Sequence, residues 1–167
     1  MRTVREAGGL DVLINNAGIT GSRVAVPDTT AADLEEVYAT NVFGPVRVLH
    51  AFAPLLHQAP AGVVVNVSSG MGSMTITSEP ERLESSIVAL AYPSSKAALN
   101  MLTTQYAKAF PELRVNAVDP GYTATDLNDN SGAQTLEEGT EVIVRMAQVP
   151  PDGPTGRFLD ARGEVPW

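Results

Sequence analysis

The stretch Gly62-Val-Val-Val-Asn-Val67 decides the fold of this chain. It is a short run of β-branched apolar residues, which is typical of a strand buried on both faces of a parallel sheet. Leu10-Asp-Val-Leu-Ile14 and Leu113-Arg-Val-Asn-Ala-Val118 have the same pattern, and Gly156-Arg-Phe-Leu-Asp160 is a shorter candidate. We therefore predict a strand over each of these segments.

Helical patterns separate the predicted strands. Thr30-Ala-Ala-Asp33 resembles a capping box at the start of a long helix, for which we predict a bend at Gly44-Pro45. A second helix is expected from about residue 92 to residue 110, where Pro111 stops it. Thr135-Leu-Glu-Glu138 caps a last helix of about three turns. Strands that alternate with helices indicate an α/β fold with a parallel sheet and right-handed crossovers.

The remaining segments are expected to be helix ends and loops. Residues 2–7 have the pattern of a helix end that Gly8-Gly9 closes, and residues 15–29 form a loop rich in Gly, Pro and polar residues. Residues 70–90 are expected to form a polar loop, because neither a helical nor a strand period is visible there. Since no internal repeat occurs, we expect a single domain over residues 1–167.

The composition narrows the class of protein. The chain has 167 residues, of which 44% are hydrophobic and 18% charged, enough for one domain with a buried core. Its net charge is -8 and no Lys/Arg cluster occurs, which argues against a nucleic-acid partner. The absence of Cys excludes disulfides and thiolate chemistry. Without a signal-peptide core or an apolar run of about 20 residues, we expect a soluble cytoplasmic protein with no membrane partner.

Small and polar residues directly follow three of the predicted strands. These segments are Asn15-Asn16-Ala17-Gly18, Ser68-Ser69-Gly70 and Asp119-Pro120-Gly121. The carboxyl ends of parallel strands meet at one edge of a sheet, where ligands bind in open α/β folds. Small residues there let the backbone approach a ligand closely. We therefore expect the three segments to form one ligand site.

Tyr92-Pro-Ser-Ser-Lys96 opens the helix that follows the second of these segments. Residues four apart lie on the same face of a helix, so an ammonium would stand beside a phenol. The positive charge favours the phenolate and should lower the pKa of Tyr92 from its ordinary value of about 10. This would provide an acid and base without His or metal. An exposed Tyr/Lys pair on a helix surface is the alternative, and the spacing taken alone favours it.

Five short motifs occur along the chain in a definite order. They are Asn15-Asn16-Ala17-Gly18, Thr40-Asn41-Val42-Phe43-Gly44, Val65-Asn66-Val67-Ser68-Ser69, Tyr92-x-x-x-Lys96 and Pro120-Gly121-Tyr122-Thr123-Ala124-Thr125. Together they resemble the short-chain dehydrogenase/reductase family from its fourth strand to its C-terminus. The resemblance implies a partial Rossmann-type, doubly wound parallel sheet. The tail, residues 153–160 with Val165-Pro166-Trp167, is similar to the carbonyl-reductase-like branch, which favours NADP(H) over NAD(H).

The resemblance implies hydride transfer between a nicotinamide cofactor and a small-molecule carbonyl or alcohol. Tyr92 would give its proton to the carbonyl oxygen, and Lys96 would hold the nicotinamide ribose. Ser69 would hydrogen-bond the substrate oxygen, and it is preferred to Ser68 because the family's serine precedes a short x-x-Gly and Gly72 fits that spacing. Asn41 would bend its helix and hold a water in a proton relay behind the lysine.

The same resemblance implies which residues contact the cofactor. They are Asn15, Ala17, Gly18, Tyr92, Lys96, Pro120, Gly121, Thr123 and Thr125. Each has a plainer alternative, because Asn can cap a strand-end turn, hydroxyls can bond the local backbone, and Pro-Gly is a common turn pair. No metal is expected, since His50 and His57 lie seven residues apart with no acidic or His partner at ligand spacing.

One part of the family pattern is missing from the printed sequence. No Gly-rich turn of the form T-G-x-x-x-G-x-G precedes Leu10, so we expect an N-terminally truncated domain without a seat for the adenosine half of the cofactor. The strand at 10–14 would then be an open edge, which predicts poor stability, aggregation, or pairing as a homodimer. The long interval from Ser69 to Tyr92 also indicates an inserted segment near 73–90 that covers the site or hinders dimer contacts. A catalytically inactive fragment that acts as a binding or dimerisation module is the alternative to a reductase.

Overall fold

The computed structural model describes residues 4, 6 and 8–167, and these contain one parallel sheet of four strands. The strands follow one another across the sheet in chain order: β1 (Val12–Asn15), β2 (Val63–Val67), β3 (Arg114–Val118) and β4 (Phe158–Leu159). All four predicted strands and the parallel α/β sheet are confirmed. The last strand is shorter than predicted, since it has only two residues.

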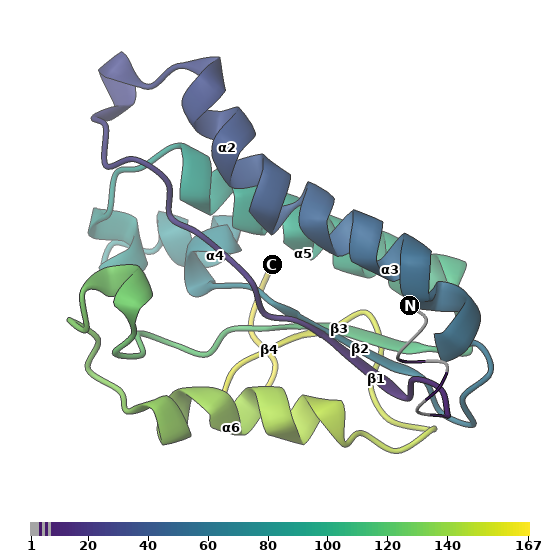
Figure 1. Cartoon of the computed structure of the whole chain (residues 1–167). Coiled ribbons are helices and arrows are strands. Elements are labelled where there is room, and N and C mark those ends of the chain that lie inside the picture. Colours follow the sequence, from purple (N-terminus) through teal and green to yellow (C-terminus); the bar gives the residue numbers. More distant parts are fainter. Residues whose placement is uncertain (1–3, 5, 7) are drawn as a thin grey trace.

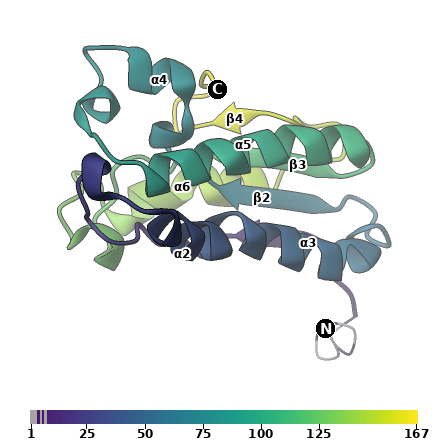
Figure 2. The ribbon, with the colours of Figure 1, turned by 90° about the horizontal axis from the view of Figure 1, so that it is seen from above.

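Helices cover both faces of the sheet. Figure 1 shows α2 (Ala31–Asn41), α3 (Phe43–Leu56) and α5 (Ala91–Ala109) on one face and α6 (Leu136–Ala147) on the other. Seen from above, α5 runs beside the α2–α3 pair over the strands (Figure 2). The doubly wound arrangement that the sequence predicts is therefore present.

The two predicted capping boxes begin α2 and α6. Thr30 and Asp33 exchange bonds at the start of α2, where the Asp33 carboxylate accepts the Thr30 amide at 2.9 Å. Thr135 and Glu138 make the same reciprocal pair at the start of α6, with the Glu138 amide donating to the Thr135 hydroxyl at 3.2 Å. Each box satisfies amides that the first helical turn leaves without a partner.

The long first helix is broken at Val42, two residues before the predicted bend at Gly44-Pro45. Pro45 lacks the N–H that would bond the Asn41 carbonyl four residues earlier, and its ring crowds that carbonyl. The effect of a proline therefore appears one turn upstream of the proline itself. The prediction identified the cause of the break but placed it too late in the chain.

The segment from residue 70 to 90 is not the plain loop that we predicted. It contains η2 (Gly70–Gly72), α4 (Met74–Ser78) and η3 (Leu83–Ser86). Ser73 begins α4 by accepting the Ile76 amide at 3.0 Å. Helical turns this short do not repeat an apolar position, so no period could show them in the sequence.

Two apolar clusters hold the layers together. One packs Leu49 and Leu56 of α3 against Val64 and Val115 of the sheet. The other packs Val142 and Met146 of α6 against the opposite face of β2 and β3. All five residues of β2 are buried, whereas β1 is half-buried and its Ile14 is 41% exposed. The sheet is therefore well covered in its middle and open at β1.

The helix end expected at residues 2–7 lies mostly outside the described residues, although the Gly9 amide bonds the Val4 carbonyl at 3.2 Å. No helix within the part of the chain that the structure describes is long and apolar enough to cross a membrane.

Candidate functional site

The predicted site residues gather where the strands end. Ser69 follows β2, Pro120 and Gly121 follow β3, and Asn15 ends β1. Tyr92 lies in the first turn of α5, which packs against the η2 turn that follows Ser69 and against β3. Segments far apart in the sequence therefore supply one rim, as the order of the motifs predicted.

Tyr92 and Lys96 lie side by side on α5. The Lys96 ammonium is 5.5 Å from the centre of the Tyr92 ring, and it donates a hydrogen bond to the Val67 carbonyl at 2.8 Å. The lysine side chain is buried, with 4% of its surface exposed. Burial lowers the pKa of Lys96 to about 8, while the charge of Asp119 acts in the opposite direction. The helical spacing thus brings the two groups together as predicted.

The direction of the Tyr92 pKa is the reverse of our expectation. Burial raises the pKa of the phenol, hydrogen bonding with the Ser69 side chain lowers it, and the charge of Asp119 raises it. The expectation of a pKa lowered by Lys96 is therefore wrong for this arrangement. The lysine is turned to a backbone carbonyl, and desolvation of the phenol outweighs any benefit from that charge. Burial of the phenol therefore favours its neutral form.

The two serines after β2 point to different places. The Ser68 hydroxyl is buried and donates to the Asn100 side chain on α5 at 2.6 Å. Ser69 is half-buried, accepts the Met71 amide at 3.2 Å, and neighbours the Tyr92 phenol. Ser68 is thus bonded to α5 inside the fold, and Ser69 lies next to Tyr92. This geometry agrees with the preference for Ser69.

Asn41 joins three elements through its side chain. Its amide oxygen accepts the Ile19 amide at 2.9 Å, and its nitrogen donates to the Ile19 carbonyl at 2.9 Å and to the Ser95 hydroxyl at 3.0 Å. Ser95 in turn donates to the Tyr92 carbonyl at 2.7 Å. Asn41 therefore fixes the loop after β1 and the first turn of α5 relative to each other.

On the β1 side, the predicted cofactor residues have unlike environments. The Asn15 side chain donates to the Asn66 side chain at 2.8 Å, so it is turned toward the neighbouring strand. Ala17 is exposed. A side-chain carbon added at Gly18 would lie 3.4 Å from the Lys96 ammonium and 3.5 Å from the Asn41 amide oxygen. The Gly18 backbone thus passes close to the lysine, as a site for a close-fitting ligand requires.

After β3, the predicted residues form a compact turn. Gly121 has a φ of +74°, which favours glycine, and its amide donates to Asp119 at 3.0 Å. Thr123 donates to the Pro120 carbonyl at 3.2 Å, and Thr125 begins η4 (Asp126–Asn128) with a capping box. Both threonines thus have local structural roles, and cofactor contact by them stays a prediction.

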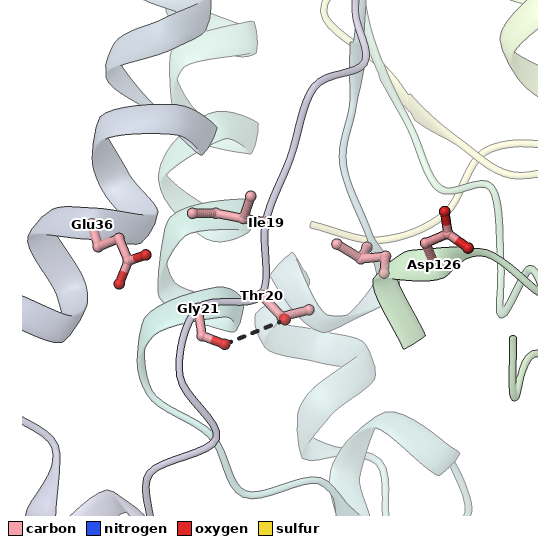
Figure 3. Close-up of a pocket in the computed structure, with 6 residues that line it drawn as sticks. Ile19, Thr20, Gly21, Glu36 and Asp126 are labelled. Atoms are coloured by element: carbon pink, nitrogen blue, oxygen red, sulfur yellow. Dashed lines mark hydrogen bonds between the residues drawn. The ribbon is translucent and has the colours of Figure 1, made fainter. Parts of the chain in front are cut away.

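A hollow of about 330 Å³ lies next to the segments that follow β1 and β3. Its lining consists of Ile19, Thr20, Gly21, Glu36, Asp126 and Leu127. Figure 3 shows the Glu36 and Asp126 side chains on opposite sides of the backbone at Ile19–Gly21. Because Ile19 follows Gly18 and Asp126 follows Thr125, the hollow adjoins the predicted cofactor residues of both β1 and β3.

Sequence reasoning missed two sets of residues that shape the site. One is a polar network inside the fold, in which Asn66 donates to Thr103 at 2.9 Å and Asn100 donates to the Gly72 carbonyl at 3.1 Å. An Asn within an otherwise apolar strand could have signalled it, since buried amides need partners. The other is Asp119, which the strand-end motif contained but to which we gave no role. Within the described residues, no cluster of three or more His, Cys, Asp and Glu side chains could hold a metal ion.

Comparison with known proteins agrees with this geometry. The family model described as short chain dehydrogenase matches residues 1–136. Human carbonyl reductase [NADPH] 1 is 32% identical, over 98% of this chain and 72% of that protein. The C-signal protein of Myxococcus xanthus is 34% identical, over 96% of this chain and 94% of that protein. The crystal structure of NADPH-bound carbonyl reductase from chicken fatty liver superimposes with a TM-score of 0.84 at 31% identity, covering 98% of this chain and 68% of that one.

The chain therefore belongs to the short-chain dehydrogenase family. It is an oxidoreductase of the carbonyl-reductase type, and its sheet and helices form part of that family's Rossmann-type fold. The resemblance that the five motifs indicated is confirmed.

Proposed function

We propose that this chain reduces a small-molecule carbonyl with NADP(H), and that Tyr92 is the proton donor. The observation that carries the proposal is the position of the Tyr92 phenol beside both the Ser69 side chain and the buried Lys96 ammonium. A bound nicotinamide dinucleotide would supply the hydride. Ser69 would bind the substrate oxygen and Tyr92 would give it a proton, so that developing negative charge is neutralised.

The residues around Lys96 fit a nicotinamide ribose. An ammonium has three donors, and the Val67 carbonyl takes one of them. Gly18 places no side chain beside the ammonium, where an added carbon would lie 3.4 Å from the nitrogen. Asn15, Ala17, Pro120, Gly121, Thr123 and Thr125 complete the proposed cofactor contacts. The choice of NADP(H) is supported by the NADPH named for the human relative and bound in the chicken structure.

Asn41 would take part through its backbone. Its side-chain donors are already used by Ile19 and Ser95, but its carbonyl has no N–H to receive from Pro45. That carbonyl is suited to hold a water behind Lys96, which would return a proton to the site. The water relay expected at Asn41 is therefore proposed for the main chain rather than for the amide.

Replacement of Tyr92 by Phe tests the proton donor. Ketone-dependent oxidation of NADPH should fall by about two to four orders of magnitude, the usual value of a general acid. NADPH affinity, measured by fluorescence titration, should change little because the ring stays in place. Turnover that survives in Tyr92→Phe removes this residue from the acid role.

Ser69→Ala and Ser68→Ala form a matched pair for the substrate-binding hydroxyl. We expect Ser69→Ala to lower kcat and to lower stability less than Ser68→Ala does, since it removes only the half-buried bond from the Met71 amide. Ser68→Ala should lower the melting temperature more, because it removes the buried bond to Asn100. The opposite pattern would assign the substrate contact to Ser68.

A second candidate function is a binding or dimer-forming module without catalysis. The half-exposed β1 edge favours it. An NADPH titration separates the two candidates. Micromolar binding with ketone-dependent oxidation excludes the inert module, and failure of both supports it.

A further inference from the structure

Residues 74–90 connect the two proposed reacting side chains along the chain. They follow the η2 turn that Ser69 begins, and they lead directly into α5, whose first turn carries Tyr92. In the middle of the segment, a Glu84 carboxylate oxygen of η3 lies 2.8 Å from the place that a side-chain carbon would take at Gly70. The segment therefore stays next to the turn of Ser69 before it reaches the helix of Tyr92.

Few hydrogen bonds tie this segment to the rest of the fold. Ile76 is the buried residue of α4, and the residues of η3 are half-buried or exposed. Among the described residues, the hydrogen bonds of residues 74–90 reach partners no more than four positions away along the chain, with two exceptions. The larger apolar side chains of the segment are mostly exposed, namely Met74, Leu83, Ile87, Val88 and Leu90.

Both exceptions lead from Thr75 to the main-chain oxygen of Trp167. The Thr75 amide donates to this oxygen at 3.2 Å, and the Thr75 hydroxyl donates to it at 3.0 Å. The amide belongs to the first turn of α4, where N–H groups have no partner within the helix. Figure 2 shows the end of the chain marked C next to α4. Trp167 therefore satisfies a donor that α4 cannot satisfy itself.

The Trp167 ring fixes the place of this oxygen. It stacks on the ring of Phe158 in β4, with the ring centres 5.5 Å apart, and Phe158 is fully buried. The Val165 amide also donates to the Phe158 carbonyl at 2.9 Å. The edge of the sheet is thus connected to α4 through residues 165–167.

We propose that Trp167 is a positioning residue for the ketone substrate, because its ring rests on β4 while its oxygen holds α4, and with it residues 74–90, beside Ser69 and Tyr92. The two bonds from Thr75 to Trp167 are called the clasp below. This inference rests on the proposed function for its link to the reaction. Without the clasp the segment opens more often and the ketone binds more weakly, whereas the cofactor contacts proposed after β1 and β3 remain.

Thr75→Ala and Thr77→Ala form a matched pair on α4. Thr75→Ala removes the hydroxyl bond of the clasp. The Thr77 hydroxyl donates to the Ser73 carbonyl at 2.7 Å, so Thr77→Ala makes the same chemical change on the same short helix and leaves the clasp intact. Trp167→Ala removes the stacking that places the oxygen, and Trp167→Phe keeps an aromatic ring on Phe158.

The first measurement is tryptic cleavage after Arg82, which lies within the segment. Under native conditions the rate of cleavage follows the population of the opened segment. We expect cleavage to be about threefold to tenfold faster in Trp167→Ala and about twofold to fivefold faster in Thr75→Ala, as for the loss of one or two hydrogen bonds. Thr77→Ala and Trp167→Phe should stay within about twofold of the wild type.

The second measurement is steady-state reduction of acetophenone with NADPH. An aryl ketone is used because the exposed side chains of the segment are largely apolar. Trp167→Ala should raise the KM for the ketone by about threefold to tenfold, with kcat and the KM for NADPH changed by less than about twofold. General loosening of the fold would instead lower kcat or weaken NADPH as well, and Trp167→Phe should restore the wild-type KM.

The proposal is overturned if Trp167→Ala is cleaved at the wild-type rate, or if Thr77→Ala is cleaved as fast as Thr75→Ala. It is also overturned if cleavage becomes faster while the KM for the ketone stays unchanged. If Trp167→Ala does not fold, Thr75→Ala provides the same comparison, because Thr75 is exposed. If the wild type reduces no ketone, the proposed function fails and the positioning of a ketone fails with it, while the cleavage rates still decide whether the clasp holds the segment.

Discussion

The middle of the sheet and its β1 edge are built from similar apolar strands but have different surroundings. β2 has neighbours on both sides and every residue buried, whereas β1 pairs with β2 alone among the described residues. The opposite edge is closed differently, because the C-terminal segment returns along β4. There Val165 donates to the Phe158 carbonyl at 2.9 Å, and Trp167 stacks on the Phe158 ring at 5.5 Å.

The candidate catalytic and cofactor-binding residues are distributed according to this difference in packing. The middle of the sheet carries Ser69 and Asp119, and α5 above it carries Tyr92 and Lys96. The open edge carries only residues proposed to contact the cofactor. Burial is the main cause of the shifted pKa values of Tyr92 and Lys96, and the middle of the sheet provides that burial. The open edge can offer backbone groups and small residues to a cofactor without being buried.

The largest expected effect in the middle of the sheet concerns the buried charge of Lys96. Its pKa is lowered from 10.5 to about 8, so the folded state binds fewer protons between these values. Stability should therefore rise with pH across this window, by about 3 kcal/mol in all. Urea unfolding at several pH values measures this. Lys96→Met should remove the rise, and a wild-type profile that stays flat from pH 8 to 10 would contradict the effect of burial.

Matched valine truncations compare the two regions directly. Val64 is fully buried, so Val64→Ala opens a cavity in the core and should lower the free energy of unfolding by about 2 kcal/mol. Val12→Ala, at the half-buried edge, should lower it by less than about 1 kcal/mol. Equal losses in urea titrations would show that β1 is covered as well as β2.

The polar ladder that links edge and middle gives an intermediate effect. Asn66 accepts from Asn15 at 2.8 Å and donates to Thr103 at 2.9 Å, so Asn66→Ala removes two bonds. We expect a loss of about 2 kcal/mol, against about 1 kcal/mol for Asn15→Ala, which removes one. Thermal unfolding of both single variants and the double variant measures the coupling, and strict additivity would argue against the ladder.

The smallest effect on stability is expected for Ile14→Lys on the open edge. Ile14 is 41% exposed, so the change should alter the free energy of unfolding by less than about 0.5 kcal/mol. A charged edge residue should nevertheless weaken pairing through β1, if the wild type associates there. Sedimentation at several concentrations shows whether this occurs. A monodisperse, cooperatively unfolding wild-type monomer would contradict association or poor stability caused by this edge.

Much of the fold could be predicted because its signals are local. The capping boxes at Thr30 and Thr135 each depend on residues within one helical turn, and the β-branched runs indicated the strands directly. The prediction failed where the cause acts at a distance along the chain or in too few residues. The Pro45 ring breaks the helix one turn upstream, and α4 has only five residues.

The sequence by itself determined the order in which the motifs follow the strands. It also determined that Tyr92 and Lys96 lie on one helix face, because spacing along a helix is a local property. Only the tertiary structure decided the direction of the Lys96 ammonium toward Val67 and the raised pKa of Tyr92. It also decided that the Asp119 carboxylate accepts the Gly121 amide at the end of β3. Burial and charge depend on residues distant in the chain, so no local pattern could have specified their balance.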